Sequence, residues 1–190
     1  MRTTMFLIAM LVGVATASAG KKAGVTMPDT ATVGDKSLVL NGMGLREATW
    51  LDIDVYVAGL YVEKPSSDPA TLIAADGPKL LVLKFVRHVD RDDIVKAWSE
   101  GFKNNATVPL AQIQPLIDRL NTWMPRFANG DTLSFSYVPD KGVEVAINGV
   151  RKGAIQGAEF ARSLFSIWLG PKPPTGALKR GLLGNHGGKK

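Results

Sequence analysis

The sequence contains no cysteine. A chain without cysteine forms no disulfide bond, offers no thiolate to a zinc ion and has no cysteine nucleophile. It also lacks the side chain that carries the lipid of a bacterial lipoprotein. The composition therefore excludes a disulfide scaffold, a zinc finger, a cysteine-dependent enzyme and a lipid-anchored protein.

Histidine and the common cofactor motifs are scarce as well. The two histidines are His88 and His186, and His186 lies close to the C-terminus, so a site with two histidine ligands is not expected. The aspartates of "DRDD" at 90–93 precede an amphipathic segment, where they favour the positive end of a helix. No P-loop or Gly-x-Ser-x-Gly motif is present. We therefore expect no metal and no cofactor.

Only one apolar run is long enough to suggest targeting. It covers residues 5–14, follows Arg2 and precedes the small residues at 17–19. This order is that of a secretory signal peptide, and the run is shorter than the roughly 20 residues that span a bilayer. We expect residues 1–19 to be removed, the mature protein to begin near Gly20 and its location to be the periplasm. The alternative is an N-terminal core helix.

The excess of positive charge lies near the C-terminus. The formal net charge is +6, and much of it comes from the segment 171–190, which is rich in glycine, proline and lysine. This composition predicts a flexible basic tail, either solvated or in weak contact with anionic lipid. Because the rest of the chain is nearly balanced in charge, the sequence does not indicate a nucleic-acid partner.

The remaining sequence predicts one domain at residues 37–170, after a turn-rich lead-in at 20–36 with an edge strand around Val25–Met27. Alternating apolar residues predict strands, and apolar residues three or four positions apart predict helices. The strands are expected at 37–42, 50–63, 79–86, 131–138 and 142–149, and the helices at 92–105, 109–124 and 157–170. Strands and helices in separate runs indicate an α+β domain, with helices on one face of an antiparallel sheet.

The segment "LVLNGMGLREATWLDIDVYVAGLYVE" resembles chalcone isomerase-like proteins. In that family a Gly-x-Gly-x-Arg turn leads into a strand that ends in Gly-x-Tyr-x-Glu. The matching positions are Gly42, Gly44, Arg46, Gly59, Tyr61 and Glu63. The resemblance covers roughly residues 38–170, and the export signal and the "IWLGPKPP" ending are most similar to the bacterial secreted branch.

The resemblance implies an open-faced β-sandwich, in which a layer of helices covers one face of a large antiparallel sheet. A ligand cleft lies between the long strand and the helices. In the plant enzymes, an arginine at the position of Arg46 stabilises the oxyanion during closure of the flavanone ring. A threonine at the position of Tyr56, a tyrosine just before the first helix and a water complete that polar network. Other members bind fatty acids without isomerase activity, and an arginine and a tyrosine hold the carboxylate.

The sequence departs from the plant enzymes at these hydroxyl groups. Tyr56 stands at the threonine position, and no tyrosine occurs between Val62 and Asn129. Loss of one donor from an oxyanion site typically lowers the rate about 10²–10³-fold. We therefore predict a periplasmic, non-catalytic protein that binds a small hydrophobic or amphipathic acid, such as a fatty acid. One alternative is an isomerase that cyclises a chalcone-like enone, with Arg46 as its catalytic residue. Another is a structural or partner-binding protein whose cleft is closed.

Three residues are candidates for ligand binding: Arg46, Tyr56 and Lys84. Lys84 is included because relatives have a lysine near the cleft. Each candidate has a simpler interpretation, as a solvated loop arginine, a half-exposed strand aromatic and a surface lysine. The large aromatic residues of the predicted helices are expected to belong mostly to the core, and they are Trp98, Phe102, Phe160, Phe165 and Trp168.

Overall fold

The computed structural model describes residues 19–48 and 53–184. The predicted signal peptide lies outside the described residues, except for Ala19, and so do residues 185–190. Within the described ranges, no helix has the length and apolar character needed to cross a membrane.

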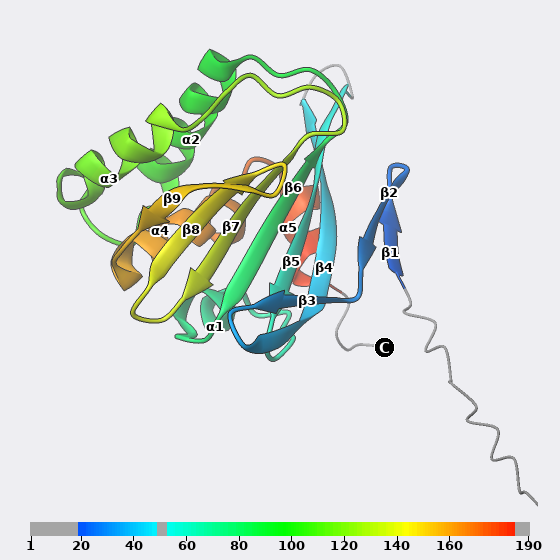
Figure 1. Cartoon of the computed structure of the whole chain (residues 1–190), viewed down its shortest axis with the longest axis horizontal. Coiled ribbons are helices and arrows are strands. Elements are labelled where there is room, and N and C mark those ends of the chain that lie inside the picture. Colours follow the sequence, from blue (N-terminus) through cyan, green and yellow to red (C-terminus); the bar gives the residue numbers. More distant parts are fainter. Residues whose placement is uncertain (1–18, 49–52, 185–190) are drawn as a thin grey trace, which may run out of the picture.

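The centre of the molecule is a seven-stranded antiparallel sheet whose strands follow one another in chain order (Figure 1). The predicted strands and the antiparallel arrangement are confirmed. The strands are β3 (Thr30–Val33), β4 (Lys36–Ala48), β5 (Ile53–Val62), β6 (Lys79–Phe85), β7 (Thr132–Val138), β8 (Gly142–Ile147) and β9 (Val150–Ile155).

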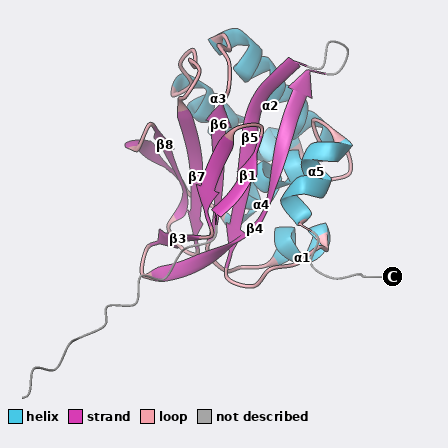
Figure 2. Cartoon of the chain, turned by 90° about the vertical axis from the view of Figure 1, so that its right-hand side faces the viewer, coloured by secondary structure: helices cyan, strands magenta, loops and turns pink. Residues whose placement is uncertain are grey.

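The helices gather on one side of this sheet, as predicted (Figure 2). They are α1 (Pro69–Ala74), α2 (Arg91–Asn105), α3 (Leu110–Thr122), α4 (Ala158–Leu169) and α5 (Gly176–Leu183). Helix α1 was not among the predicted helices, although its start has clear signals in the sequence. Asp68 accepts hydrogen bonds from two backbone N–H groups of the first turn, and Pro69 follows at a position that suits proline.

Aromatic side chains form the centre of the core between the sheet and α2 and α4. The Trp98 ring lies 5.4 Å from the Trp168 ring, and Phe135 lies 5.9 Å from Trp168. All three side chains are at most 2% exposed. The Trp98–Trp168 pair is edge-to-face, and such a pair adds about 0.5–1.5 kcal/mol beyond the burial of its area. The expectation that the helical aromatics belong to the core is confirmed.

Strand β4 continues beyond the short strand expected at 37–42. It includes the whole Gly-x-Gly-x-Arg segment, with irregular pairing to β5 between Leu40 and Gly42 and between Arg46 and Glu47. The turn expected there is therefore a strand with two bulges. The bulges explain the error, because each breaks the strict alternation by which a strand is recognised in sequence.

The predicted flexible tail is wrong for residues 176–183, which form α5. Leu178 and Leu182, one helical turn apart, are fully buried. The glycines of β4 make this packing possible, because a Cβ atom on Gly42 would lie 2.2 Å from the Gly181 carbonyl oxygen. The helix backbone thus rests directly on the strand, and glycine is required for this close approach.

A separate two-stranded hairpin, β1 (Ala19–Lys22) and β2 (Val25–Pro28), packs beside β4 on the face opposite α5 (Figure 1). Met27 of β2 is 4% exposed, and its sulfur occupies the space that Gly59 leaves open. Met43 of β4 fills the space at Gly20 in the same way. The edge strand expected around Val25–Met27 is present, but its partner is β1.

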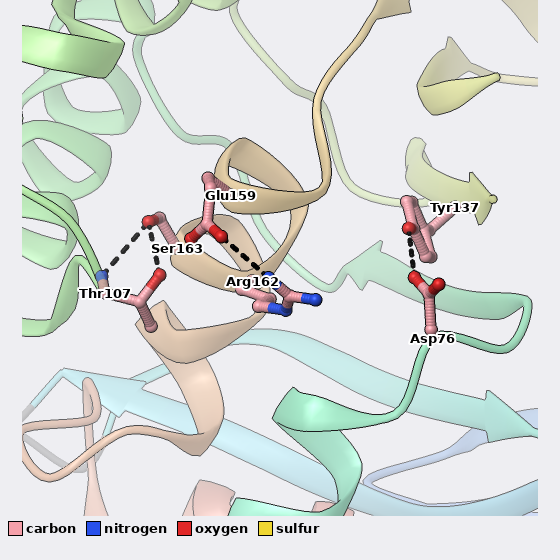
Figure 3. A network of polar contacts seen from close by, with 6 residues as sticks. All are labelled: Asp76, Thr107, Tyr137, Glu159, Arg162 and Ser163. Carbon is pink, nitrogen blue, oxygen red and sulfur yellow. Dashed lines mark hydrogen bonds and ion pairs between the residues drawn. The ribbon is translucent and has the colours of Figure 1, made fainter. Parts of the chain in front are cut away.

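A buried lysine holds the end of α1 to the sheet. Lys79 is 4% exposed, and its ammonium donates to the carbonyl oxygens of Leu72 (3.0 Å) and Ala75. Nearby, the Tyr137 hydroxyl donates to Asp76 at 2.9 Å (Figure 3). Burial lowers the pKa of Lys79 from 10.5 to about 8, although the Asp76 carboxylate acts in the opposite direction.

This pKa predicts an unusual dependence of stability on pH. Between pH 8 and pH 9, Lys79 keeps its proton in the unfolded chain and loses it in the folded protein, so this residue makes the free energy of unfolding rise with pH. Above about pH 9, Tyr56, Tyr61 and Tyr137 act in the opposite direction, because their pKa values are raised to about 12 in the folded protein. We expect a gain of about 1 kcal/mol between pH 8 and pH 9, measured by urea unfolding. The variant Lys79→Met should show no such gain. An equal gain in that variant would contradict the assignment to Lys79.

Candidate functional site

A cavity of about 600 Å³ lies between the ends of β4 and β5, helix α2 and the segment that follows α4. Its walls are largely apolar, and several polar side chains lie among them or at the rim. The apolar wall includes Val55, Val89, Ile94, Ala97, Trp98 and Ile167. The sheet supplies two of the polar residues that were predicted from the sequence, Arg46 and Tyr56.

Arg46 is positioned by the glycines that precede it on β4. Gly42 and Gly44 face α5, and alternation along the strand places Arg46 on the same face of the sheet. Arg46 pairs directly with Tyr56 of β5, and its guanidinium donates one hydrogen bond to the Glu47 carbonyl oxygen. Arg46 lines the cavity from strand β4 and does not lie on a loop, and its side chain is partly exposed.

Tyr56 is buried at the inner wall of the cavity, with 4% exposure. Its hydroxyl oxygen accepts a hydrogen bond from Nε1 of Trp168 at 3.0 Å. Burial raises the pKa of the Tyr56 hydroxyl to about 12, although the Trp168 hydrogen bond and the Arg46 charge both lower it. The hydroxyl therefore keeps its proton at neutral pH, and within the described residues no acceptor takes that proton.

Lys84 lies on the opposite face of the sheet. It pairs with Val57, whereas its neighbour Phe85 pairs with Tyr56 and faces the helices. Lys84 instead borders a separate, open hollow together with Asp54 and Asn129. The structure thus brings Arg46 and Tyr56 together, and it places Lys84 outside their cavity.

The two polar residues that the sheet contributes to the cavity, Arg46 and Tyr56, offer hydrogen-bond donors. The Arg46 guanidinium has only donors. The Tyr56 oxygen already accepts a hydrogen bond from Trp168, and the Tyr56 O–H group is still able to donate one. An ionised carboxylate has only acceptors and suits both groups. The sheet side of the cavity is therefore complementary to an anion.

The rim carries charges of both signs. Arg87 and Lys172 contribute positive charge, and Asp93 and Glu100 of α2 contribute negative charge. Lys172 is held beside α2 because its backbone N–H and C=O both hydrogen-bond to the Asn105 side chain at 2.8 Å. These exposed rim groups are screened by solvent, so they affect the rate of ligand entry more than affinity.

Sequence reasoning missed two of these contributors. Trp168 was expected only in the core, and its hydrogen bond to Tyr56 joins residues 112 positions apart, which no local pattern reveals. Lys172 was assigned to the flexible tail. The proline-rich composition around it concealed the contact with Asn105.

Comparison with known proteins supports the fold and the family. No curated protein matches the sequence. Among solved structures, a fatty-acid binding protein of Arabidopsis thaliana is similar, with a TM-score of 0.70 and 18% sequence identity. The match covers 87% of this chain and 96% of that chain, and at this identity it establishes the fold alone.

The fold is thus the chalcone isomerase-like arrangement that the sequence predicted. The family model described as chalcone isomerase-like matches residues 19–184, which include every described strand and helix. The chain belongs to the chalcone isomerase-like family.

Proposed function

We propose that this protein is a non-catalytic carrier of a small amphipathic acid, such as a fatty acid, and that it acts in the periplasm. One observation carries the proposal: the cavity combines apolar wall residues with two donors, Arg46 and Tyr56, which are paired on adjacent strands of the sheet. The signal-peptide pattern of residues 1–19 supports the location.

The dimensions suit a small ligand. Binding sites for small molecules have volumes of about 300–1,000 Å³, and this cavity falls within that range. Burial of the ligand's apolar part would contribute about 25 cal/mol per Å², before the cost of ordering the ligand. The Arg46 guanidinium would orient the carboxylate through paired hydrogen bonds.

A structural relative supports the same choice of ligand. The similar Arabidopsis protein is described as a fatty-acid binding protein, and it shares the overall fold. An open cavity also argues against the structural role that we considered as an alternative, because that role requires a closed cleft.

An isomerase would require more hydrogen-bond donors than this cavity provides. Ring closure needs several donors directed at the developing oxyanion. The tyrosine that the plant enzymes have just before the first helix has no counterpart between Val62 and Asn129. We therefore expect chalcone cyclisation at the rate seen in buffer, monitored by ultraviolet absorbance. A clear acceleration that is lost in Arg46→Gln would replace the carrier proposal with the isomerase.

The direct test is binding of dodecanoate to the protein that begins at Gly20. We expect native mass spectrometry to show one bound dodecanoate and titration calorimetry to give a saturable one-to-one curve. Dodecan-1-amine is the matched control, because it has the same chain but a cationic head that Arg46 repels. Equal uptake of acid and amine, or no uptake of either, would contradict the proposal. Cell fractionation tests the periplasmic location independently.

A further inference from the structure

The hydrogen bond from Trp168 to Tyr56 connects helix α4 to the sheet beneath the cavity. The indole Nε1 lies 3.0 Å from the phenol oxygen, and the two residues are 1% and 4% exposed. Solvent therefore does not compete for this bond. The Trp168 ring is held in place by Trp98 at 5.4 Å and by Phe135 at 5.9 Å.

The chemistry of the two groups fixes the direction of this bond. An indole N–H is only a donor, whereas a phenol hydroxyl both donates and accepts. Trp168 therefore donates to a lone pair of the Tyr56 oxygen. The hydroxyl proton of Tyr56 needs a different acceptor. Within the described residues Tyr56 has no other hydrogen-bond partner, and it lines the cavity beside Arg46.

We infer that Trp168 is a positioning residue, which holds Tyr56 as a hydrogen-bond donor toward the carboxylate of the bound ligand. This inference rests on the proposed function and deepens it. Without the indole N–H, the Tyr56 oxygen would be an unpaired buried acceptor, and its hydroxyl could rotate toward another partner. Trp168 is not among the residues that line the cavity, so it would act on the ligand through Tyr56.

A double-mutant cycle separates this role from simple packing. Trp168→Phe keeps an aromatic ring and removes the N–H, and Tyr56→Phe removes the hydroxyl. We expect Trp168→Phe to weaken dodecanoate binding about three- to tenfold when Tyr56 is present. In the Tyr56→Phe background, the same change should alter the affinity less than about twofold. Equal losses in both backgrounds would overturn the inference, because packing alone would then explain them.

Trp98→Phe is the matched control for lost indole volume. Trp98 is also buried beside Trp168, but its Nε1 has no hydrogen-bond partner among the described residues. Its effect on affinity should therefore be the same with and without the Tyr56 hydroxyl. A coupling as large as that of Trp168 would show that the cycle measures general disturbance of the core.

A measurement without ligand keeps the inference separate from the proposed function. In nitrogen-15 spectra of the free protein, Tyr56→Phe should shift the Trp168 indole resonance and speed the exchange of its proton. An unchanged resonance would overturn the inference even if dodecanoate binds. A shifted resonance without any dodecanoate binding to the wild type would overturn the proposed function, and with it the ligand-directed role, but would confirm the hydrogen bond.

Discussion

Replacing Gly44 by alanine is expected to lower the free energy of unfolding by about 3 kcal/mol. The new Cβ atom would lie 2.3 Å from the Leu178 carbonyl oxygen and 2.7 Å from its Cδ1 atom. A side chain could rotate away from such contacts, but the backbone of α5 cannot. The helix must therefore move off β4, and the burial of Leu178 and Leu182 is lost.

Thermal or urea unfolding measures this loss, which corresponds to about 6–12 °C in Tm for a domain of this size. Gly176→Ala is the matched control on the same helix. Its Cβ atom would approach only the flexible end of Arg180, at 3.2 Å, so a change of at most about 0.5 kcal/mol is expected. If Gly44→Ala unfolded at the wild-type midpoint, α5 could not pack on β4 as the structure shows.

Replacing Arg46 by glutamine is expected to weaken dodecanoate binding about 10- to 100-fold. Charge-assisted hydrogen bonds to a carboxylate contribute about 1.5–3 kcal/mol, and each 1.4 kcal/mol corresponds to a factor of ten. Glutamine keeps a donor and much of the side-chain length, so the loss reflects charge and paired geometry. Titration calorimetry of the wild type and the variant gives the ratio.

Lys84→Gln is the control for this prediction. It removes the same positive charge from the opposite face of the sheet, where Lys84 borders a different hollow. We expect less than a twofold change in affinity, and the unfolding midpoint should remain close to that of the wild type. Comparable losses in the two variants would show that overall charge, and not a contact by Arg46, governs binding.

The fold could be predicted from the sequence wherever one periodicity extended over a whole element. Strand β7 alternates without interruption, and α2 and α4 keep their apolar residues at helical spacing. The prediction was wrong for β4 and α5, where the local sequence pattern did not match the structure that formed. Bulges obscured β4, and the composition of the last twenty residues concealed the apolar spacing of α5.

Some residues of the candidate site could be predicted from the sequence and others could not. Arg46 and Tyr56 could be identified because the family resemblance places both within one short segment. The sequence alone could not show that Lys84 lies outside the cavity. The pairing of β5 with β6 shows it, because it places Lys84 on the opposite face of the sheet from Tyr56. The contribution of Trp168 depends on a contact between distant segments, and one sequence contains no signal of such a contact.

The docking of α5 on β4 has a consequence for the order of events during synthesis. The strand that carries Arg46 is made early, whereas the helix that covers its glycines is made last. A nascent chain that has not yet reached Gly176 leaves that side of β4 bare, and contacts between distant segments form slowly. The face of β4 that carries Arg46 should therefore be covered only after α5 has emerged, so a chain that stops before Gly176 is expected to bind dodecanoate less tightly than the wild type.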